Sequence, residues 1–369
     1  MSGGERDRAG GESALGDAAP GATADVGGDP IDYFLQDMEL HGKSDRTRAE
    51  YGRVLRRFAA FLRDPDRGPG GGAADPGEAS HRDCMAFVHA LRRDPELAES
   101  TTATYAAYLH RFFAYMTQVG AFDANPMTLV MEELDERIDP DPTRREISVP
   151  RMREFVAEID HPLERALVIT LLKTGMRVGE LCNLDLRDLT LDRRLPGYDP
   201  GDRAQLDGRP DSLYVASEPA VGEPYNGEER TASNKRKRGT VIPVDGELAE
   251  TLVRWLVVRP DAVSPAEPLF VGTASGWGER LTPEQVGRVV REHAARAGWY
   301  ERGAGATGNV TPHYFRHFFT THLRDRTGDR GVVKYLRGDV ADDIIDTYTH
   351  NWGDNVRETY ERHVYSLLE

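Results

Sequence analysis

The sequence predicts a mainly α-helical protein that carries one small antiparallel β-sheet and is divided into two domains. Apolar residues recur at helical spacing through most of the chain, and only two short segments, SLYVAS and TVIPV, have the pattern of strands. A charged, proline-punctuated segment, residues 132–149, suits an interdomain linker. We therefore expect a helical domain over residues 30–131 and a mixed α+β domain over residues 150–369.

The N-terminal half begins with a segment that predicts disorder. Residues 1–29 are rich in Gly, Ala and Asp and have almost no large apolar side chains, so they predict a disordered acidic tail. Helical periodicity then begins, and further helices around residues 85–91 and over residues 100–118, the last closed by Gly120, complete a bundle of four or five. The inward faces of the first two helices comprise Ile31, Phe34, Leu35, Met38, Tyr51, Leu55, Phe58 and Leu62.

The C-terminal half mixes helices with the two strand segments. Helices are expected at about residues 150–159 and 162–174. The strands follow, separated by a long Gly/Pro-rich insertion that ends in the basic tip NKRKRG. A further helix starts with Thr282 as its cap and Pro283 in its first turn, and the remainder of the chain is expected to be helical.

Composition narrows the class of protein. With 369 residues and 39% hydrophobic content, the chain is long enough for two domains with cores. Its longest apolar runs are too short to cross a bilayer and its N-terminus has no signal-peptide pattern, so we expect a cytoplasmic protein without a membrane partner. Cys84 and Cys182 lie far apart without a CxxC spacing, which indicates core thiols and neither a disulfide nor a metal site.

The net charge of −15 argues at first against a nucleic-acid partner. Only five of the 47 basic residues are Lys, however, and acidic residues are spread along the whole chain. This composition resembles that of proteins from salt-loving organisms, in which molar salt shortens the Debye length to roughly 3 Å and local arginine clusters decide binding. We therefore expect a halophilic archaeal source, with an ordinary acidic cytosolic protein as the alternative.

One basic cluster suits a phosphate. The stretch TPHYFRHFFTTHL places His313, Arg316 and His317 on the first turns of a predicted helix, where three nitrogen bases are unusual beside buried aromatic residues. Three other segments accompany HYFRH along the chain. Two precede it, first TGMRVGELCNLDLRDL and then NKRKRGTVIPV, and IIDTYTH follows it. Each segment alone is a weak signal, but four in register are specific.

Together the four segments resemble the tyrosine recombinase, or phage integrase, family. Its Xer-type members carry T-G-x-R-x-x-E-L, a lysine on a hairpin before V-P, H-x-x-R-H and Y-T-H. The helices that include STTATYAAYLHRFFAYMTQVGAFDANP also resemble the SAM-like core-binding domain of this family, so the likeness covers about residues 30–350. It implies a core-binding domain followed by a catalytic domain of the tyrosine recombinase fold.

The resemblance assigns Arg177 and Arg316 to the non-bridging oxygens of the scissile phosphate. Arginine suits this task because it binds in a bidentate manner and remains charged next to a phosphorane. The resemblance also implies that Glu180 orients these arginines without contacting the phosphate itself. The alternative is a simple surface ion pair between Arg177 and Glu180 at i+3.

The general acid is assigned to Lys235, which lies eight residues before Pro243 as the hairpin lysine does in Xer-type members. Lys237 could replace it if the hairpin slips by two residues, because that slip keeps the same face. A basic tip that only touches the DNA backbone is the remaining alternative.

The two histidines receive different expectations. His313 matches the first position of H-x-x-R, where imidazole can accept or share the proton of the nucleophile. His317 is expected to support the helix instead.

One position departs from the family pattern. The family carries a His or Trp nine residues before the nucleophile, and the ungapped count places Asp339 there. A carboxylate beside a phosphate would be repelled, so Asp339 is expected to point away, to pair with Arg337, or to be replaced in function by His350 or Trp352.

The nucleophile is assigned to Tyr348, 32 residues after Arg316, which is the ungapped Xer-type spacing. Tyr360 is the competitor, but it demands an insertion of twelve residues and belongs to an amphipathic run with Val356, Val364 and Leu367 that suits packing on a neighbour, including another protomer.

The resemblance implies a site-specific DNA recombinase or integrase that cleaves and rejoins double-stranded DNA through a 3′-phosphotyrosyl intermediate. Because the covalent link retains the phosphodiester energy, neither ATP nor a metal nor another cofactor is expected. The expected assembly is a homotetramer in the synaptic complex and a monomer when free. The alternatives are a type IB topoisomerase-like nicking and closing enzyme, which the separate helical domain disfavours, and a non-catalytic DNA-binding protein derived from the same fold.

Overall fold

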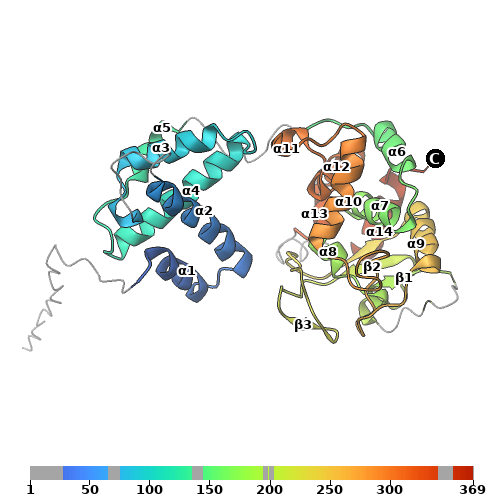
Figure 1. The fold of residues 1–369 in the computed structure, drawn as a ribbon. Helices are drawn as coiled ribbons and strands as arrows, with labels where there is room; N and C mark the ends of the chain where they lie inside the picture. Colours follow the sequence, from blue (N-terminus) through green and yellow to red (C-terminus); the bar gives the residue numbers. More distant parts are fainter. Residues whose placement is uncertain are drawn as a thin grey trace, which may run out of the picture. The chain divides into compact units, whose positions relative to one another are not determined.

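The structure of the chain is a computed structural model that describes residues 28–64, 75–134, 144–193, 198, 203–339 and 352–368. The chain divides into two compact units, Met1–Asp141 and Pro142–Glu369, each with its own hydrophobic core. The fold is mostly helical with a small antiparallel sheet, as the sequence predicts (Figure 1). Residues 1–27 of the predicted tail lie outside the described residues.

The N-terminal unit is a bundle of helices. They are α1 (Pro30–Leu40), α2 (Asp45–Arg63), α3 (His81–Arg92), α4 (Glu99–Gln118) and α5 (Met127–Glu133), with the short 3₁₀ helix η1 (Pro76–Glu78) before α3. The side chain of Asp29 accepts a hydrogen bond from the N–H of Ile31 and caps α1, while Ser80 and Asp83 form a capping box at α3. Inward faces of these helices meet in an aromatic core formed by Phe34, Phe58, Phe87, Phe112 and Phe113.

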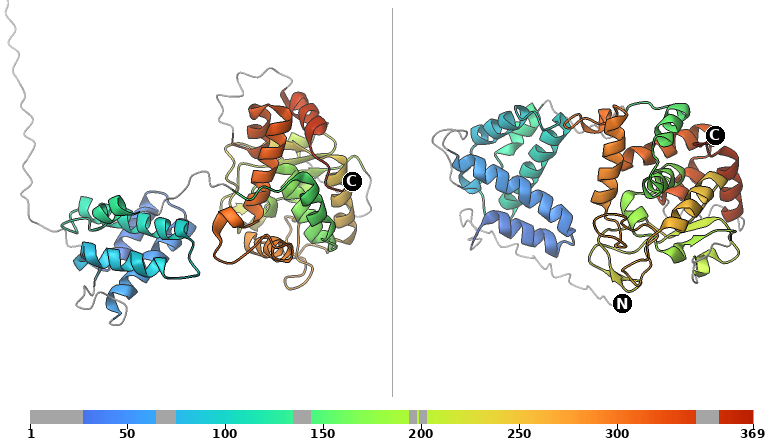
Figure 2. Two further views of the ribbon diagram at one scale, coloured as in Figure 1. Left: turned by 90° about the horizontal axis from the view of Figure 1, so that it is seen from above. Right: turned by 45° about the vertical axis from the view of Figure 1, so that its right-hand side comes forward.

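The C-terminal unit is built around α7 (Pro162–Thr174), a green helix in the middle of this unit (Figure 2). Its residues from Ala166 to Thr174 are all buried. Helices α6 (Val149–Ala157), α9 (Gly246–Val258), α10 (Pro283–Arg296) and α12 (Pro312–Thr327) pack against it. A helix buried on every side is expected from the run ALVITLL, which has no polar face. The remaining helices of the unit are α8 (Val178–Cys182), α11 (Gly305–Gly308), α13 (Arg330–Arg337) and α14 (Trp352–His363), with the 3₁₀ helices η2 (Leu186–Asp188) and η3 (Ala204–Leu206).

The predicted strands pair directly with each other. Strand β2 (Ser212–Val215) lies antiparallel between β1 (Leu189–Thr190) and β5 (Thr240–Pro243), with Leu213 opposite Ile242. The insertion between β2 and β5 holds a separate ribbon of β3 (Pro224–Tyr225) and β4 (Glu228–Glu229). Strands of two residues leave no alternating pattern to recognise, which is why the sequence predicted only β2 and β5. The cap predicted for α10 is confirmed, because Thr282 and Gln285 form a capping box and Pro283 opens the helix.

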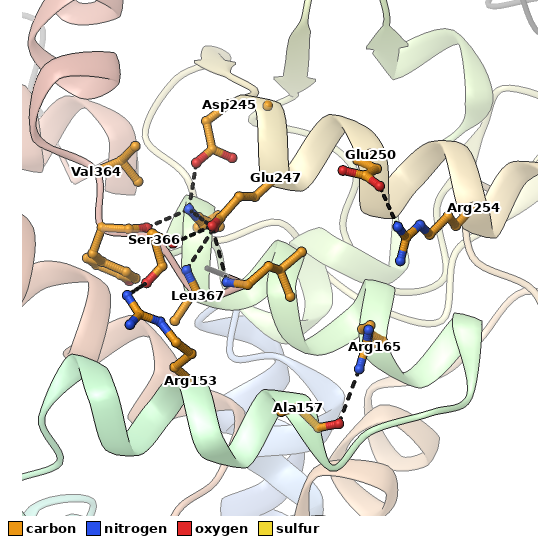
Figure 3. Close-up of a pocket in the computed structure, with 14 residues that line it drawn as sticks. Arg153, Ala157, Arg165, Asp245, Glu247, Glu250, Arg254, Val364, Ser366 and Leu367 are labelled. Atoms are coloured by element: carbon orange, nitrogen blue, oxygen red, sulfur yellow. Dashed lines mark hydrogen bonds and ion pairs between the residues drawn. The ribbon is translucent and has the colours of Figure 1, made fainter.

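The C-terminal segment closes the core of the same chain. Lys173 is fully buried, and its Nζ lies 2.5 Å from Asp245 Oδ2, 2.7 Å from Glu247 Oε2 and 2.5 Å from the carbonyl oxygen of Tyr365. Figure 3 shows Glu247 facing this segment, where its carboxylate accepts hydrogen bonds from the Leu367 N–H at 2.8 Å and the Ser366 hydroxyl at 2.5 Å. Asp245 and Glu247 therefore pair the buried charge of Lys173, and the C-terminal segment adds the carbonyl oxygen of Tyr365 as a further acceptor.

Candidate active site

Helix α12 holds Arg316 in a fixed position. Thr311 and Pro312 begin the helix, so Arg316 lies on its second turn, where it is only 2% exposed. Its Nη1 donates hydrogen bonds to the carbonyl oxygens of Gly175 at 2.7 Å and Arg337 at 3.0 Å. Burial lowers the pKa of Arg316 to about 10, which leaves the guanidinium charged at neutral pH.

A glycine makes the first of these contacts possible. Gly175 ends α7 in the left-handed conformation, with φ of 62°, and a β carbon at this position would lie 2.3 Å from the ring of Phe319. The tight turn brings the carbonyl oxygen of Gly175 to α12 and places Arg177 two residues later, at the start of α8.

Arg177 is held from behind by Glu180. The backbone N–H of Arg177 donates to Glu180 Oε2 at 2.9 Å, and its Nη1 donates to Oε1 at 3.0 Å and to the carbonyl oxygen of Lys235 at 3.1 Å. Glu180 is fully buried, so the i+3 pair is not a surface ion pair. Because Nη1 of Arg177 contacts Glu180, Nη2 of the same guanidinium points away from Glu180 and donates a hydrogen bond to a second carboxylate.

That carboxylate belongs to Asp339, on which the two arginines converge. Its Oδ1 accepts hydrogen bonds from Arg177 Nη2 at 2.9 Å and from Arg316 Nη2 at 2.8 Å. Its Oδ2 accepts from Arg316 Nη2 at 2.9 Å and lies 3.0 Å from Arg337 Nη2. Asp339 thus pairs with Arg337 and does not point away from the other two arginines. Burial would raise the pKa of Asp339, but the charges of Arg316 and Arg337 hold it below its ordinary value, so the carboxylate is ionised.

The basic tip lies beside these groups. Lys235 and Lys237 are exposed, whereas Arg236 between them is buried and donates to the carbonyl oxygen of Leu336 at 3.0 Å and to Glu180 Oε2 at 3.3 Å. The N–H of Lys237 donates to the carbonyl oxygen of Gly338 at 3.3 Å. Both lysines precede β5, which begins at Thr240, so strand register does not decide between them.

His313 stands at the start of the helix that carries Arg316. It remains accessible to solvent, but desolvation by the surrounding protein lowers its pKa, and the positive charges of Arg144 and Arg316 lower it further. Its imidazole is therefore neutral at pH 7 and able to accept a proton. His317 lies one turn further along, with its ring centroid 6.1 Å from that of Tyr314, whose hydroxyl donates to the carbonyl oxygen of Arg145 at 2.7 Å.

Of the two tyrosines that are candidates for the nucleophile, only Tyr360 is among the residues that the structure describes. Tyr348 and His350 lie outside the described residues, and Trp352 is the first residue of α14. Tyr360 is fully buried in the core of its own unit, where its hydroxyl donates to the carbonyl oxygen of Lys173 at 3.0 Å. Burial raises its pKa well above the ordinary value, so this phenol is neither accessible nor readily ionised.

The sequence reasoning missed one residue of this cluster and gave another a minor part. Arg236 was read only as part of a basic tip, yet it is buried against Glu180, and Arg337 was named only as a partner for Asp339. The alternation of Arg236 between two lysines was the available signal for an inward side chain. In the described part of the chain there is no group of three His, Cys, Asp or Glu side chains placed to hold a metal ion, and none of its helices combines the length and apolarity needed to span a membrane.

Comparisons with known proteins identify the family of the chain. Residues 31–119 match the family model of the phage integrase N-terminal SAM-like domain, and residues 223–353 match that of the phage integrase family. The chain is 23% identical over 348 residues to tyrosine recombinase XerC of Pelobacter propionicus, covering 90% of this chain and 95% of that protein. It is 23% identical over 337 residues to tyrosine recombinase XerA of Pyrococcus horikoshii, covering 91% and 94%.

Solved structures show the same fold. The integrase of transposon Tn1549, in complex with a circular intermediate DNA, superposes with a TM-score of 0.59 at 16% identity, covering 91% of this chain and 99% of that one. A SAM-like helical unit followed by a unit that matches the phage integrase family model indicates an integrase-type protein. The chain belongs to the phage integrase, or tyrosine recombinase, family of site-specific DNA recombinases, with Xer-type relatives.

Proposed function

We propose that this recombinase cleaves and rejoins duplex DNA through a 3′-phosphotyrosyl intermediate formed on Tyr348. The observation that carries the proposal is the convergence of Arg177 Nη2 and Arg316 Nη2 on one carboxylate, which defines a position for an anion with two equivalent oxygens. The non-bridging oxygens of a scissile phosphate have this form, and arginine binds them with charge-assisted hydrogen bonds. Each guanidinium is already fixed by other groups, so little reorganisation is needed in the transition state.

The proposed chemistry is a reversible transesterification. The Tyr348 oxygen attacks phosphorus and gives its proton to His313, whose neutral ring can accept it. The bond from phosphorus to the 5′-oxygen breaks, and Lys235 protonates this leaving oxygen. A 5′-hydroxyl of the partner strand then attacks the phosphotyrosine, the bond to tyrosine breaks, and the protons return. No net oxidation or hydrolysis occurs, so the sequence of steps closes without a further reactant.

The direct test is to trap the covalent intermediate. A duplex selected for binding by the full chain is prepared with a nick close to the cleavage point, so that the short leaving strand diffuses away and religation stops. We expect a protein-DNA adduct that survives denaturation. A non-catalytic DNA-binding protein is the alternative that the occupied pocket favours, because Asp339 fills the anion position. Stable duplex binding without an adduct would establish that alternative.

Lys235→Ala is expected to slow cleavage of ordinary DNA but not of a substrate with a 5′-phosphorothiolate at the cleavage point. A sulfur leaving group needs no proton, so loss of the general acid is then without effect. Lys237→Ala is the matched control, since both lysines are exposed and both are tied to the site through backbone atoms. Cleavage rates on the two substrates decide the assignment. Thiolate rescue of Lys237→Ala instead would move the general acid by two residues.

We also propose that the protein works at high salt, in the manner of proteins from halophilic archaea. The support is the net charge of −15 and the scarcity of Lys among its basic residues. Specific duplex binding is expected to persist in molar salt, because screening removes the repulsion between DNA and the acidic surface. A titration of the dissociation constant against salt checks this. Loss of specific binding above about 0.5 M, with a steep counterion-release slope, would contradict it.

The assembly is part of the same proposal. Exchange of two strands between two duplexes requires four cleavage events, so one active site per protomer implies a homotetramer in the synaptic complex. The free protein is proposed to be a monomer and to meet its double-stranded DNA in the cytoplasm.

A further inference from the structure

Three arginines, not two, surround the anion position of the candidate active site. We propose that Arg337 is a third phosphate-binding arginine of this recombinase and that Asp339 is the internal counterion which the scissile phosphate displaces. The inference rests on the proposed function, because it concerns the same phosphate.

The geometry at Asp339 resembles the binding of an exchangeable anion. Arg177 contacts one carboxylate oxygen, Arg337 contacts the other, and Arg316 lies within 2.9 Å of both. A carboxylate and the charged part of a phosphodiester each present two equivalent oxygens that share negative charge. Donors arranged around the first are therefore arranged for the second.

Arg337 is built into the site through its backbone as well as its side chain. Its carbonyl oxygen accepts a hydrogen bond from Arg316 Nη1 at 3.0 Å, so the two arginines support each other. Gly338 then ends α13 with φ of 69°, and a β carbon there would lie 2.5 Å from Cγ of Arg236. This close approach holds the end of α13 against the loop before β5. The Nε of Arg337 is buried and has no hydrogen-bond partner among the described residues.

The charges of the cluster favour exchange of one particular carboxylate. Among the described residues, the four guanidinium groups of Arg177, Arg236, Arg316 and Arg337 form ion pairs with two carboxylates, those of Glu180 and Asp339. The side chain of Glu180 is fully buried, whereas that of Asp339 is 28% exposed. Asp339 can therefore turn into solvent while Glu180 stays. Its departure leaves three uncompensated positive charges, which suits a phosphorane that carries two negative charges.

Asp339 also stabilises the positions of the three arginines when no DNA is bound. Burial lowers the pKa of Arg337, and the positive charge of Arg177 lowers it further, so an empty pocket would be destabilised by repulsion. The bound carboxylate relieves that repulsion and keeps the donors oriented. The same carboxylate then competes with the phosphate for those donors, which moderates cleavage.

The experiment compares adduct formation by the full chain and its Arg337→Ala, Arg337→Lys and Asp339→Asn variants on two nicked duplexes. One carries an ordinary scissile phosphate, and the other carries a methylphosphonate there, which has no negative charge. Arg330→Ala is the matched control, because Arg330 is an exposed arginine at the opposite end of α13. Duplex affinity and thermal unfolding are measured for every variant, and Arg337→Lys provides a charged variant if Arg337→Ala does not fold.

We expect Arg337→Ala to slow adduct formation on the phosphate about 100-fold with duplex affinity almost unchanged. On the methylphosphonate its rate should approach that of the unchanged protein, because a neutral centre does not need the third cation. Asp339→Asn should form adduct at least as fast as the unchanged protein. Equal defects of Arg337→Ala on both substrates, or loss of adduct in Asp339→Asn, would overturn the inference while leaving the proposed function intact. Absence of an adduct from the unchanged protein would overturn both.

Discussion

Arg316→Ala and Arg177→Ala are each expected to reduce covalent adduct formation by at least 100-fold while duplex binding is largely retained. Removal of one oriented donor to an oxyanion has an effect of about 100- to 1000-fold in enzymes where it has been measured. Contacts with phosphates elsewhere position the protein on DNA, whereas these two side chains act on the transition state. The measurement is the rate of adduct formation on the nicked duplex, beside the dissociation constant for the intact duplex.

The two substitutions differ in their structural cost. Arg316 is buried and donates to the carbonyl oxygens of Gly175 and Arg337, so its loss leaves buried acceptors unpaired at a cost of about 1–3 kcal/mol. Arg177 is 30% exposed, and Glu180 still pairs with Arg236 when the side chain of Arg177 is removed. A melting curve for each variant therefore separates loss of folding from loss of chemistry, and Arg316→Lys retains the charge.

Arg324→Ala is the matched control for both, because Arg324 lies on the same helix as Arg316 and pairs only at the surface with Asp325. This variant should form adduct at the rate of the unchanged protein. Normal adduct levels in Arg177→Ala or Arg316→Ala, in contrast, would show that the assignment of that residue is wrong.

Local sequence patterns were sufficient for most of the helices and for the cap of α10. Helical periodicity and capping act within a few residues, so they can be recognised without tertiary contacts. The amphipathic run from Val356 to Leu367 also predicted packing, but the pattern did not identify the surface against which this run packs. The structure places Val356, Tyr360 and Leu367 in the core of the same chain, a result that depends on the distant Lys173 and could not be read locally.

The cluster around Asp339 shows where sequence reasoning reached its limit. Spacing identified position 339 as anomalous and left three outcomes open. The pairing of Asp339 with Arg337 could be recognised only from the structure, in which the end of α13, the turn after α7 and the start of α12 meet. Gly175, Gly338 and the buried Arg236 create that meeting, and such contacts between distant segments carry no periodic signal in the sequence.

Tyr348→Phe is expected to abolish the covalent adduct completely, because no other group replaces the phenolic oxygen that becomes bonded to phosphorus. Tyr360→Phe is the matched control, since it makes the same chemical change at the other candidate. Tyr360 is fully buried and its hydroxyl is bonded to the carbonyl oxygen of Lys173, so attack on DNA would require the core to open. Tyr360→Phe should lower the free energy of unfolding by about 1 kcal/mol and still form the adduct.

Peptide mapping of the trapped adduct completes the comparison. Position 348 follows Arg316 by 32 residues, and T-H follows it as in the Xer-type pattern, whereas Tyr360 would need twelve additional residues between α12 and the nucleophile. The raised pKa of Tyr360 makes its phenolate costly, and this agrees with a role in packing. We therefore expect phosphotyrosine on the peptide that contains residue 348. Phosphotyrosine on the peptide that contains residue 360, together with an active Tyr348→Phe variant, would reverse the assignment and would require α14 to leave the core during catalysis.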